Sequence, residues 1–277
     1  MLHLWWKMKL EAISGQKATS DGYRWRCRSS KPLVHQCTMS MRKNQAWFEK
    51  SNLTIKELLQ FTYWWSRKVP QNFLEHELGL SSATCVDWAY FALEVCEEVI
   101  LNTSSQIGGS GIHVEIDESK FGKRKYNCGR IQYGLWVFGG REVEDRGKMF
   151  MVPVEKRDEN TFLTLIKKWI RPGSIIHSDC WKAYDCLSKE GYTHLKVNHS
   201  VEFVNAETGA CTNHIENEWL HAKKSLPAYG SKHAHMNGYL AEHLWRSQVK
   251  HKGLDHFIQF LYSVSSVYNS TWHSPSV

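Results

Sequence analysis

The chain has 277 residues, of which 42% are hydrophobic and 23% charged. This composition excludes a wholly disordered protein and allows one large domain or two modest ones. The formal charge of +7 favours polyanionic partners, and the sequence holds no run of about 18 apolar residues such as a membrane span needs. The start, "MLHLWWKMKLEAISG", has no long apolar core before a cleavage site, so we expect no signal peptide and reduced, intracellular cysteines.

The first 50 residues are strongly basic, with ten Lys or Arg against three acids. Their pattern predicts short strands or the remnant of a zinc ribbon. Such a basic segment is suited to nucleic-acid contact or is a solvated surface. Cys27 and Cys37 are the pair that could belong to a ribbon, with His35 as a third ligand. A ribbon needs four ligands, usually in two close pairs, so we do not expect structural zinc.

Residues 51–101 predict helices. Ser51 or Asn52 is a candidate cap for a first helix, and Gly79 marks a turn between a short helix and one that starts at Ser81 or Ser82. This spacing is typical of the helix–turn–helix that reads DNA, and it fits a helical hairpin packed on a larger domain equally well.

After a linker at 102–111, the pattern changes to strands. The expected elements are three strands ("IHVEIDESKFG", "IQYGLWVFGG", "KMFMVPVEK"), a helix capped near Asn160 or Thr161, a strand ("SIIHSD"), a helix ("CWKAYDCLSKEG"), an extended segment ("THLKVN") and helices at 213–226, 234–250 and 254–268. This order predicts an α/β sandwich with a mixed sheet, as in ribonuclease H-like nucleases and recombinases.

Two acids close predicted strands: Asp117 ends "IHVEID" and Asp179 ends "SIIHSD". Sites in open α/β sheets gather at the carboxyl ends of strands, so the two carboxylates meet if the first and fourth strands are neighbours. An aspartate at a strand end is often a turn-former, and Asp179 could cap the next helix.

A third acid, Glu216, lies on one helix face with Lys223. Mg²⁺ prefers oxygen ligands, and two such ions about 3.5–4 Å apart can serve phosphodiester chemistry. That chemistry needs about three converging acids, and a nearby lysine can hold a phosphate. An exposed, salt-bridged helix face is the alternative interpretation of Glu216 and Lys223.

Residues 112–268 resemble the catalytic domain of DDE transposases of the Merlin superfamily and its bacterial insertion-sequence relatives. The words that carry the resemblance are "IDESKFGKRKYNCGR", "WVFGG", "IHSDCWKAY", "VNHSVEFVNAETGACTNHIENEWLHAKKSL" and "HLWR". The segment "WRCR…SMRKNQAWFEKSNLTIKELLQFTYWW" also resembles the N-terminal part of that family, although the cysteine-rich ribbon is incomplete here.

The resemblance assigns Asp117 and Asp179 as the first two catalytic acids and metal ligands. It assigns Glu216 as the third, with Asn213 as an alternative, and Lys223 as the lysine that follows. It implies Mg²⁺ or Mn²⁺ in a two-metal site.

Other motif residues receive secondary roles. The histidines inside the motifs could donate to phosphate, shuttle protons or support the fold; they are His177, His199 and His214. The basic residues that we expect to contact DNA are Lys223, Lys224, Arg24, Arg26, Arg28, Arg42 and Lys43.

The predicted organisation is a basic segment at 1–50, a helical DNA-binding domain at 51–101, the linker, a ribonuclease H-like transposase domain at 112–268 and a tail at 269–277. The resemblance implies metal-dependent strand cleavage and transfer on duplex DNA, at terminal inverted repeats and target, by a homodimer or larger synaptic assembly. The expected location is the nucleus in a eukaryote and otherwise the cytoplasm, with no membrane partner. Alternatives are a host DNA-binding protein without cleavage activity and a nuclease that acts on RNA–DNA hybrids.

Overall fold

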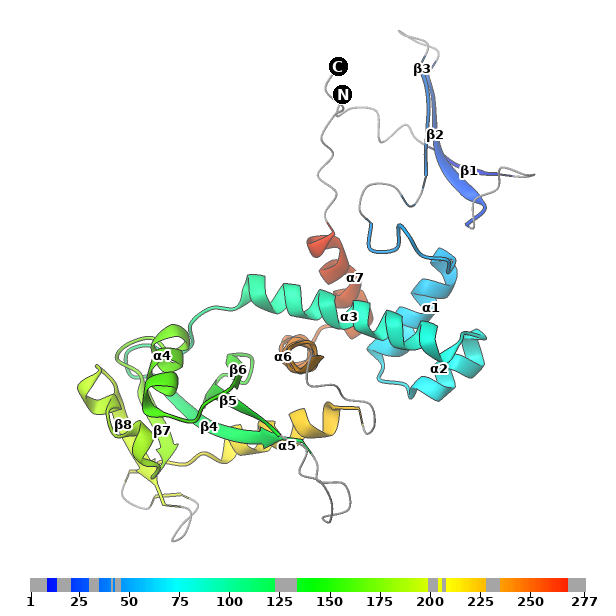
Figure 1. Ribbon diagram of the computed structural model, residues 1–277. Helices are drawn as coiled ribbons and strands as arrows, with labels where there is room; N and C mark the ends of the chain where they lie inside the picture. The colour runs from blue at the N-terminus through cyan, green and yellow to red at the C-terminus, as the bar shows by residue number, and fades with distance from the viewer. Residues whose placement is uncertain are drawn as a thin grey trace. The chain divides into compact units, whose positions relative to one another are not determined.

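A computed structural model describes residues 9–13, 21–29, 35–40, 42, 46–122, 134–198, 204–205, 208–227 and 235–268 (Figure 1). The chain forms two compact units. Residues 1–89 with 256–277 form the terminal unit, and residues 90–255 form the sheet unit. The long helix α3 (Ser82–Thr103) begins in the first and ends in the second.

The terminal unit starts with a small antiparallel sheet in the order β1-β2-β3, as the short strands of the basic segment predicted. Helices α1 and α2 follow this sheet in the chain, and α7, from the C-terminal part of the chain, belongs to the same unit. The bounds are β1 (Lys9–Ala12), β2 (Tyr23–Ser29), β3 (His35–Ser40), α1 (Ile55–Ser66), α2 (Gln71–Leu78) and α7 (His256–Val267).

Aromatic side chains form the core of the terminal unit. The ring centroids of Trp47 and Trp88 are 5.0 Å apart in an edge-on contact, and Phe260 of α7 lies 4.7 Å from Trp65 of α1. Edge-on and tilted ring contacts of this kind add to the stabilisation from burial. Helix α7 therefore packs against α1 in the core of the terminal unit. The domain boundaries that we drew from the sequence stay a prediction.

The start of α1 corrects one sequence prediction. The cap is Thr54, not Ser51 or Asn52: its hydroxyl accepts from the Glu57 amide at 3.2 Å, and the Glu57 carboxylate accepts from the Thr54 amide at 2.7 Å. The segment T-x-x-E thus provides both halves of a capping box, which a lone serine does not. The turn at Gly79 is confirmed, because this residue ends α2 with a φ of 62°.

The sheet unit contains a five-stranded mixed sheet in the order β6-β5-β4-β7-β8. The central strand β4 runs antiparallel to β5 and parallel to β7, and β8 is parallel to β7. The predicted mixed sheet is confirmed, and its first and fourth strands in chain order, β4 and β7, are neighbours. The bounds are β4 (His113–Phe121), β5 (Leu135–Glu142), β6 (Met149–Val154), β7 (Ile175–Asp179) and β8 (Thr193–Val197).

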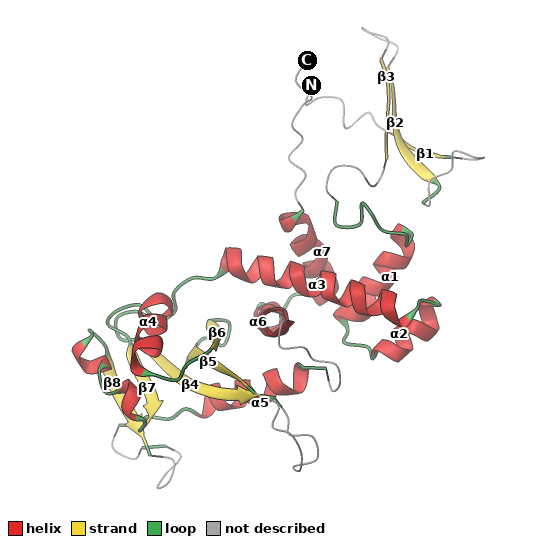
Figure 2. Cartoon of the chain, in the orientation of Figure 1, coloured by secondary structure: helices red, strands yellow, loops and turns green. Residues whose placement is uncertain are grey.

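Helices flank this sheet (Figure 2). Helix α4 (Glu159–Trp169) covers one face, α5 (Asn213–Ser225) packs on β4 and β5, and α6 (Met236–His251) packs on β6. Alternate residues of β4 serve the two faces. Val114 and Ile116 join the apolar core under α4, whereas Glu115, Asp117 and Ser119 meet α5.

Two further local predictions are corrected. Helix α4 is capped by Asp158, whose carboxylate accepts from the Thr161 amide at 2.8 Å, so the helix starts earlier than a cap at Asn160 or Thr161 implies. The segment predicted as one helix after Asp179 forms two 3₁₀ turns, η3 (Lys182–Tyr184) and η4 (Leu187–Lys189). Buried Tyr184 and Leu187 are three residues apart, a spacing that suits such turns. Among the described helices, none combines the length and apolar character needed to cross a membrane.

Candidate active site

Asp117 and Asp179 are brought together by the parallel pairing of β4 and β7. The Cα register ends with the pair Glu115 and His177, and Asp117 and Asp179 each lie two residues beyond this pair. The charge of Asp179 raises the pKa of Asp117, which reports the same proximity. The first two acids that the sequence selected therefore lie near each other on neighbouring strands.

The carboxyl group of Asp117 is held under electrostatic stress. Burial, then the charge of Glu118 and then that of Asp179 raise its pKa to about 7, although the Glu118 amide and the Trp219 indole both donate to it. The indole Nε1 lies 3.0 Å from Oδ2 of Asp117. A cation that prefers oxygen ligands would relieve this repulsion, so the pair fits a divalent metal such as Mg²⁺.

Trp219 reaches Asp117 across a glycine. Gly139 of β5 is the Cα partner of Asp117, and a Cβ atom built on Gly139 would lie 2.6 Å from Cη2 of the indole. Because Gly139 has no side chain, the buried indole of Trp219 can pack directly against the backbone of β5. Sequence reasoning missed Trp219 as a site residue; the signal was a Gly-Gly pair inside a strand, which often marks a close approach.

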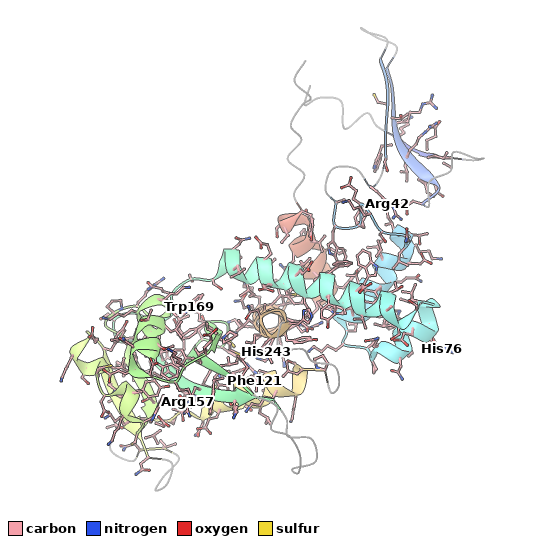
Figure 3. The ribbon with its side chains drawn as sticks, in the orientation of Figure 1. Arg42, His76, Phe121, Arg157, Trp169 and His243 are labelled. Carbon is pink, nitrogen blue, oxygen red and sulfur yellow. The ribbon has the colours of Figure 1, made fainter. Side chains whose placement is uncertain are left out.

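Lys223 lies on the same helix face, one turn beyond Trp219. Its Nζ donates to Ser119 Oγ at 2.7 Å and lies 5.5 Å from the ring centroid of Phe121, which Figure 3 labels. The pKa of Lys223 is lowered, because the effect of burial outweighs the opposing effect of the charge of Asp117. A cation therefore stands near Asp117 at an exposed position, and its contact with a DNA phosphate stays a prediction. Lys224, next in the helix, is also exposed.

Glu216 and Asn213 both lie in the first turn of α5 and are exposed. Thr212 Oγ1 donates to Oε1 of Glu216 at 2.8 Å. The helix places Glu216 on the side of Trp219 and Lys223, while the acids that act on the pKa of Asp117 are Glu118 and Asp179. Glu216 as third acid, and Asn213 as its alternative, stay predictions.

Glu115 anchors the start of α5 and was not selected from the sequence. Its fully buried carboxylate accepts from the Ile215 amide at 2.9 Å and contacts His214 Nδ1 at 2.6 Å. The thiol of Cys211 donates to it at 3.4 Å, and the pKa of that thiol is raised by burial and by the charge of Glu115. The motif histidine His214 thus belongs to the helix anchor.

His177 supports the same segment. The Cys211 amide donates to its Nδ1 at 3.3 Å, so this nitrogen carries no proton. Burial, reinforced by His113, lowers the pKa of His177, and the neutral ring carries its proton on Nε2, 2.7 Å from Nδ1 of His113. His177 is a structural acceptor in this geometry. His199 lies outside the described residues.

Glu118 faces the opposite side of the sheet from Asp117. The Tyr184 hydroxyl donates to it at 2.6 Å, and Arg157 forms an ion pair with it. The Arg157 guanidinium, labelled in Figure 3, lies 3.9 Å from the ring centroid of Trp136 and 4.7 Å from that of Trp181. Glu118 is therefore bound by Tyr184 and Arg157 on the face of the sheet opposite to Asp117.

A second buried acid fixes the far side of α5. Glu218 is fully buried, and its carboxylate lies 2.9 Å from Arg146 Nε, 3.6 Å from Arg141 Nη1 and 3.5 Å from Nε2 of His243. Figure 3 labels His243. Burial acts to raise the pKa of Glu218, but the three partners hold it below its usual value. Breaking one partner of a buried ion pair is costly, so this cluster holds α5 against β5 and α6.

The basic residues of the terminal unit are engaged within it. Arg24 and Arg26 of β2 pair with Glu11 at 3.0 and 2.9 Å. Arg42, labelled in Figure 3, is buried; its guanidinium lies 2.5 and 2.6 Å from the two oxygens of Asp21 and also donates to Leu53 O at 2.5 Å. Contact of these residues with DNA stays a prediction.

Other residues that the sequence singled out lie elsewhere in the small sheet. Arg28 lies on β2, and Cys27 and Cys37 are Cα partners across β2 and β3, with His35 at the start of β3. Lys43 lies outside the described residues.

Comparison with known proteins assigns the sheet unit to a family. Residues 107–248, just over half of the chain, match the ISXO2-like transposase domain. An uncharacterised transposase-like protein of Haemophilus influenzae is 35% identical over 107 residues, which cover 37% of this chain and 85% of that protein. The chain belongs to the ISXO2-like transposase domain family of insertion-sequence transposases.

Proposed function

We propose that this protein is a DDE transposase, related to the Merlin superfamily, that cleaves DNA at transposon ends and transfers the 3′-hydroxyl to target DNA with Mg²⁺ or Mn²⁺. The observation that carries the proposal is the adjacency of Asp117 and Asp179, at which the pKa of Asp117 is raised to about 7. A strongly perturbed carboxyl group with a defined charge partner is typical of functional sites. Family membership supports the same activity.

The sheet supports a ribonuclease H-like assignment for this domain. Its order β6-β5-β4-β7-β8, with β4 and β5 antiparallel and β4 and β7 parallel, is the arrangement expected of that fold. It puts two acids from distant parts of the chain at one place, as DDE chemistry requires.

Asp117, Asp179 and Glu216 are the residues that would hold the divalent metal. Their oxygen donors suit Mg²⁺ or Mn²⁺, and the charge of a bound cation would lower the pKa of Asp117, which burial and the neighbouring acids raise. When bound, divalent ions supply the Lewis acidity that activates a water or hydroxyl and stabilises the leaving oxygen of a phosphodiester.

The chain's own residues have separate tasks in this proposal. Trp219 fixes Oδ2 of Asp117, and its buried ring excludes water from that side of the carboxylate. Lys223, anchored through Ser119, holds a DNA phosphate by its charge. The second half of the proposal is DNA recognition by the α2–α3 pair as a helix–turn–helix, in a dimer or larger synaptic assembly.

The test is strand nicking and transfer by the full chain on duplex DNA that carries the inverted repeats flanking its gene. We expect activity only with Mg²⁺ or Mn²⁺, and a loss of more than about a thousandfold in Asp179→Ala, since such losses follow removal of a central catalytic group. Asp185→Ala, an exposed acid of the same segment, is the matched control. Wild-type rates in Asp179→Ala would refute the proposal.

Three further outcomes separate the alternatives. Glu216→Gln should lose activity and Asn213→Ala should keep it; the reverse result makes Asn213 the third position. Sequence-specific binding without cleavage under any divalent metal would identify a DNA-binding protein without catalytic activity. Preference for an RNA–DNA hybrid over duplex DNA would identify a hybrid nuclease.

A further inference from the structure

Next to the acid pair, three different metal-binding side chains converge: Glu115, Cys211 and His214. One potential ligand atom from each lies within 4.8 Å of the other two. Oε1 of Glu115 is the shared point, 3.4 Å from Cys211 Sγ and 2.6 Å from His214 Nδ1. We propose that these residues form a second metal site, for a borderline transition metal such as Zn²⁺, distinct from the oxygen-donor site at Asp117.

One of the ligand separations already matches that of a bound zinc ion, and a second needs a small adjustment. Ligand atoms of a tetrahedral site lie about 3.3–3.8 Å apart, as follows from bond lengths of about 2.0–2.3 Å. The contact between Glu115 and Cys211 already meets this spacing, and the shorter one between Glu115 and His214 must open by about 1 Å. His214 sits on the helix surface with its side chain 44% exposed, so it has room to turn.

The donor set differs in kind from that of the acid pair. A thiolate and an imidazole favour zinc and related transition metals, whereas Mg²⁺ prefers carboxylates, carbonyls and water. The two sites therefore select different ions although Glu115 and Asp117 lie on the same face of one strand. Three protein ligands leave a fourth position for water, as in other three-ligand zinc sites.

The surrounding hydrogen bonds orient two of the ligands. The Ile215 amide occupies Oε2 of Glu115 and leaves Oε1 directed at the other donors. His177 accepts from the Cys211 amide and fixes the backbone that carries the thiol. Partners of this kind outside the ligand shell usually accompany a metal site, because they set the ligand orientation.

The proposal has a direct consequence for α5. His214 belongs to the first turn of that helix and Glu115 to the central strand, so a bound ion would tie the helix that carries Trp219 and Lys223 to the sheet. This site stands independently of DNA cleavage, since metal binding can be measured without DNA.

Cobalt titration of the metal-free full chain tests the proposal. We expect a thiolate-to-cobalt charge-transfer band that corresponds to one thiolate-bound Co²⁺ per chain, and we expect Zn²⁺ to displace this ion. Cys211→Ser should abolish the band, and His214→Ala should weaken binding by at least about tenfold. Cys180→Ser, which removes an exposed free thiol, is the matched control and should bind as the wild type does. The double variant Cys27→Ser/Cys37→Ser tests the only other pairing that the sequence suggested.

A thermal measurement keeps the test decisive if Cys211→Ser folds poorly. Zn²⁺ at a hundredfold excess over Kd should raise the Tm of the wild type by about 5–10 °C. His214→Ala, at a half-exposed position, should fold and lose this shift. Unchanged cobalt spectra and Tm shifts in the Cys211 and His214 variants, or binding that depends on Cys27 and Cys37, would overturn the proposal. Failure of the cleavage assay alone would leave it standing.

Discussion

The contact between β4 and α5 has two parts that handle a buried acid in opposite ways. At the start of the helix, Glu115 is surrounded by donors from Cys211, His214 and Ile215. Two residues further along the same strand face, burial and the charges of Glu118 and Asp179 raise the pKa of Asp117 to about 7. The carboxylate of Glu115 therefore stabilises the contact between β4 and α5, whereas the ionised carboxylate of Asp117 destabilises it.

This difference shows how the fold tolerates a destabilising pair of acids. An acid pair destabilises the fold unless the surrounding structure is independently secured, and stability is commonly given up at functional sites. Glu115 and Glu218 secure α5 from two sides, so Asp117 need not contribute to holding the helix. Four substitutions test this difference between the two acids.

The largest expected effect comes from removing the anchor. Glu115→Ala leaves the Ile215 amide and the Cys211 thiol without their buried acceptor, and we expect a loss of about 3–5 kcal/mol in the free energy of unfolding. Urea denaturation measures it. Glu98→Ala, which removes an exposed acid bonded to Asn102, should change stability by less than about 0.5 kcal/mol. A loss below about 1 kcal/mol in Glu115→Ala would show that Glu115 is no anchor.

Asp117→Asn should act in the opposite direction. The folded chain keeps the Asp117 proton up to about pH 7, whereas the unfolded chain releases it near the ordinary value of 3.8. The folded state therefore binds more protons in this window, and stability falls as pH rises from about 4 to about 7. The neutral amide still accepts from Trp219, so without metal at pH 8 the variant should gain about 2–4 kcal/mol.

Denaturation at pH 4 and pH 8 checks this gain, which should vanish at the lower pH. Asp185→Asn is the control, because its carboxylate is paired with Lys196 at the surface; it should show no gain at pH 8. Equal stability of Asp117→Asn and wild type at both pH values would mean that Asp117 is not strained.

Gly139→Ala should disturb the indole that holds Asp117. The new methyl would meet Cη2 of Trp219 at 2.6 Å and the Phe150 carbonyl oxygen at 3.0 Å, and overpacking of this kind costs about 1–3 kcal/mol. Trp219→Phe removes the colliding ring atoms, so the double variant should recover part of the loss attributed to that collision. Losses that simply add in a double-mutant cycle would contradict the contact.

Lys223→Met should have the smallest effect on stability, below about 1 kcal/mol, because the ammonium group is exposed. Its effect should appear in DNA binding, where losing one phosphate contact reduces the slope of log K against log salt by about 0.9. Lys168→Met, on α4, is the control and should leave the slope unchanged. An unchanged slope in Lys223→Met would remove Lys223 from the DNA interface.

The sequence was sufficient to predict the strands of the sheet and to place Asp117 and Asp179 on neighbouring strands. Apolar runs that end in Asp117 and Asp179 are local signals, and the usual neighbour relation of the first and fourth strands brings them together. The capping errors were also local: "TIKE" contains a complete capping box at Thr54, a stronger signal than Ser51 or Asn52.

The rest of the site depends on contacts that no local pattern contains. Trp219 and Asp117 are 102 positions apart, and Glu115 is 100 positions from Ile215. Their pairing follows from which face of β4 the helix covers and from the space that Gly139 leaves. Asn213 and Glu216 share the first turn of α5, so helical spacing alone does not separate them.

The Arg42 cluster has a practical consequence for dissecting DNA recognition. Asp21 accepts both from the Arg42 guanidinium and from the Ile55 amide at the start of α1, at 2.9 Å, while Arg42 donates to Leu53 O. A truncated chain beginning after residue 50 would therefore lose a partner of its first helix along with the small sheet. Fragments meant to isolate the α1–α3 helices should begin before Asp21, so that a weakened affinity reports lost DNA contacts and not a frayed helix end.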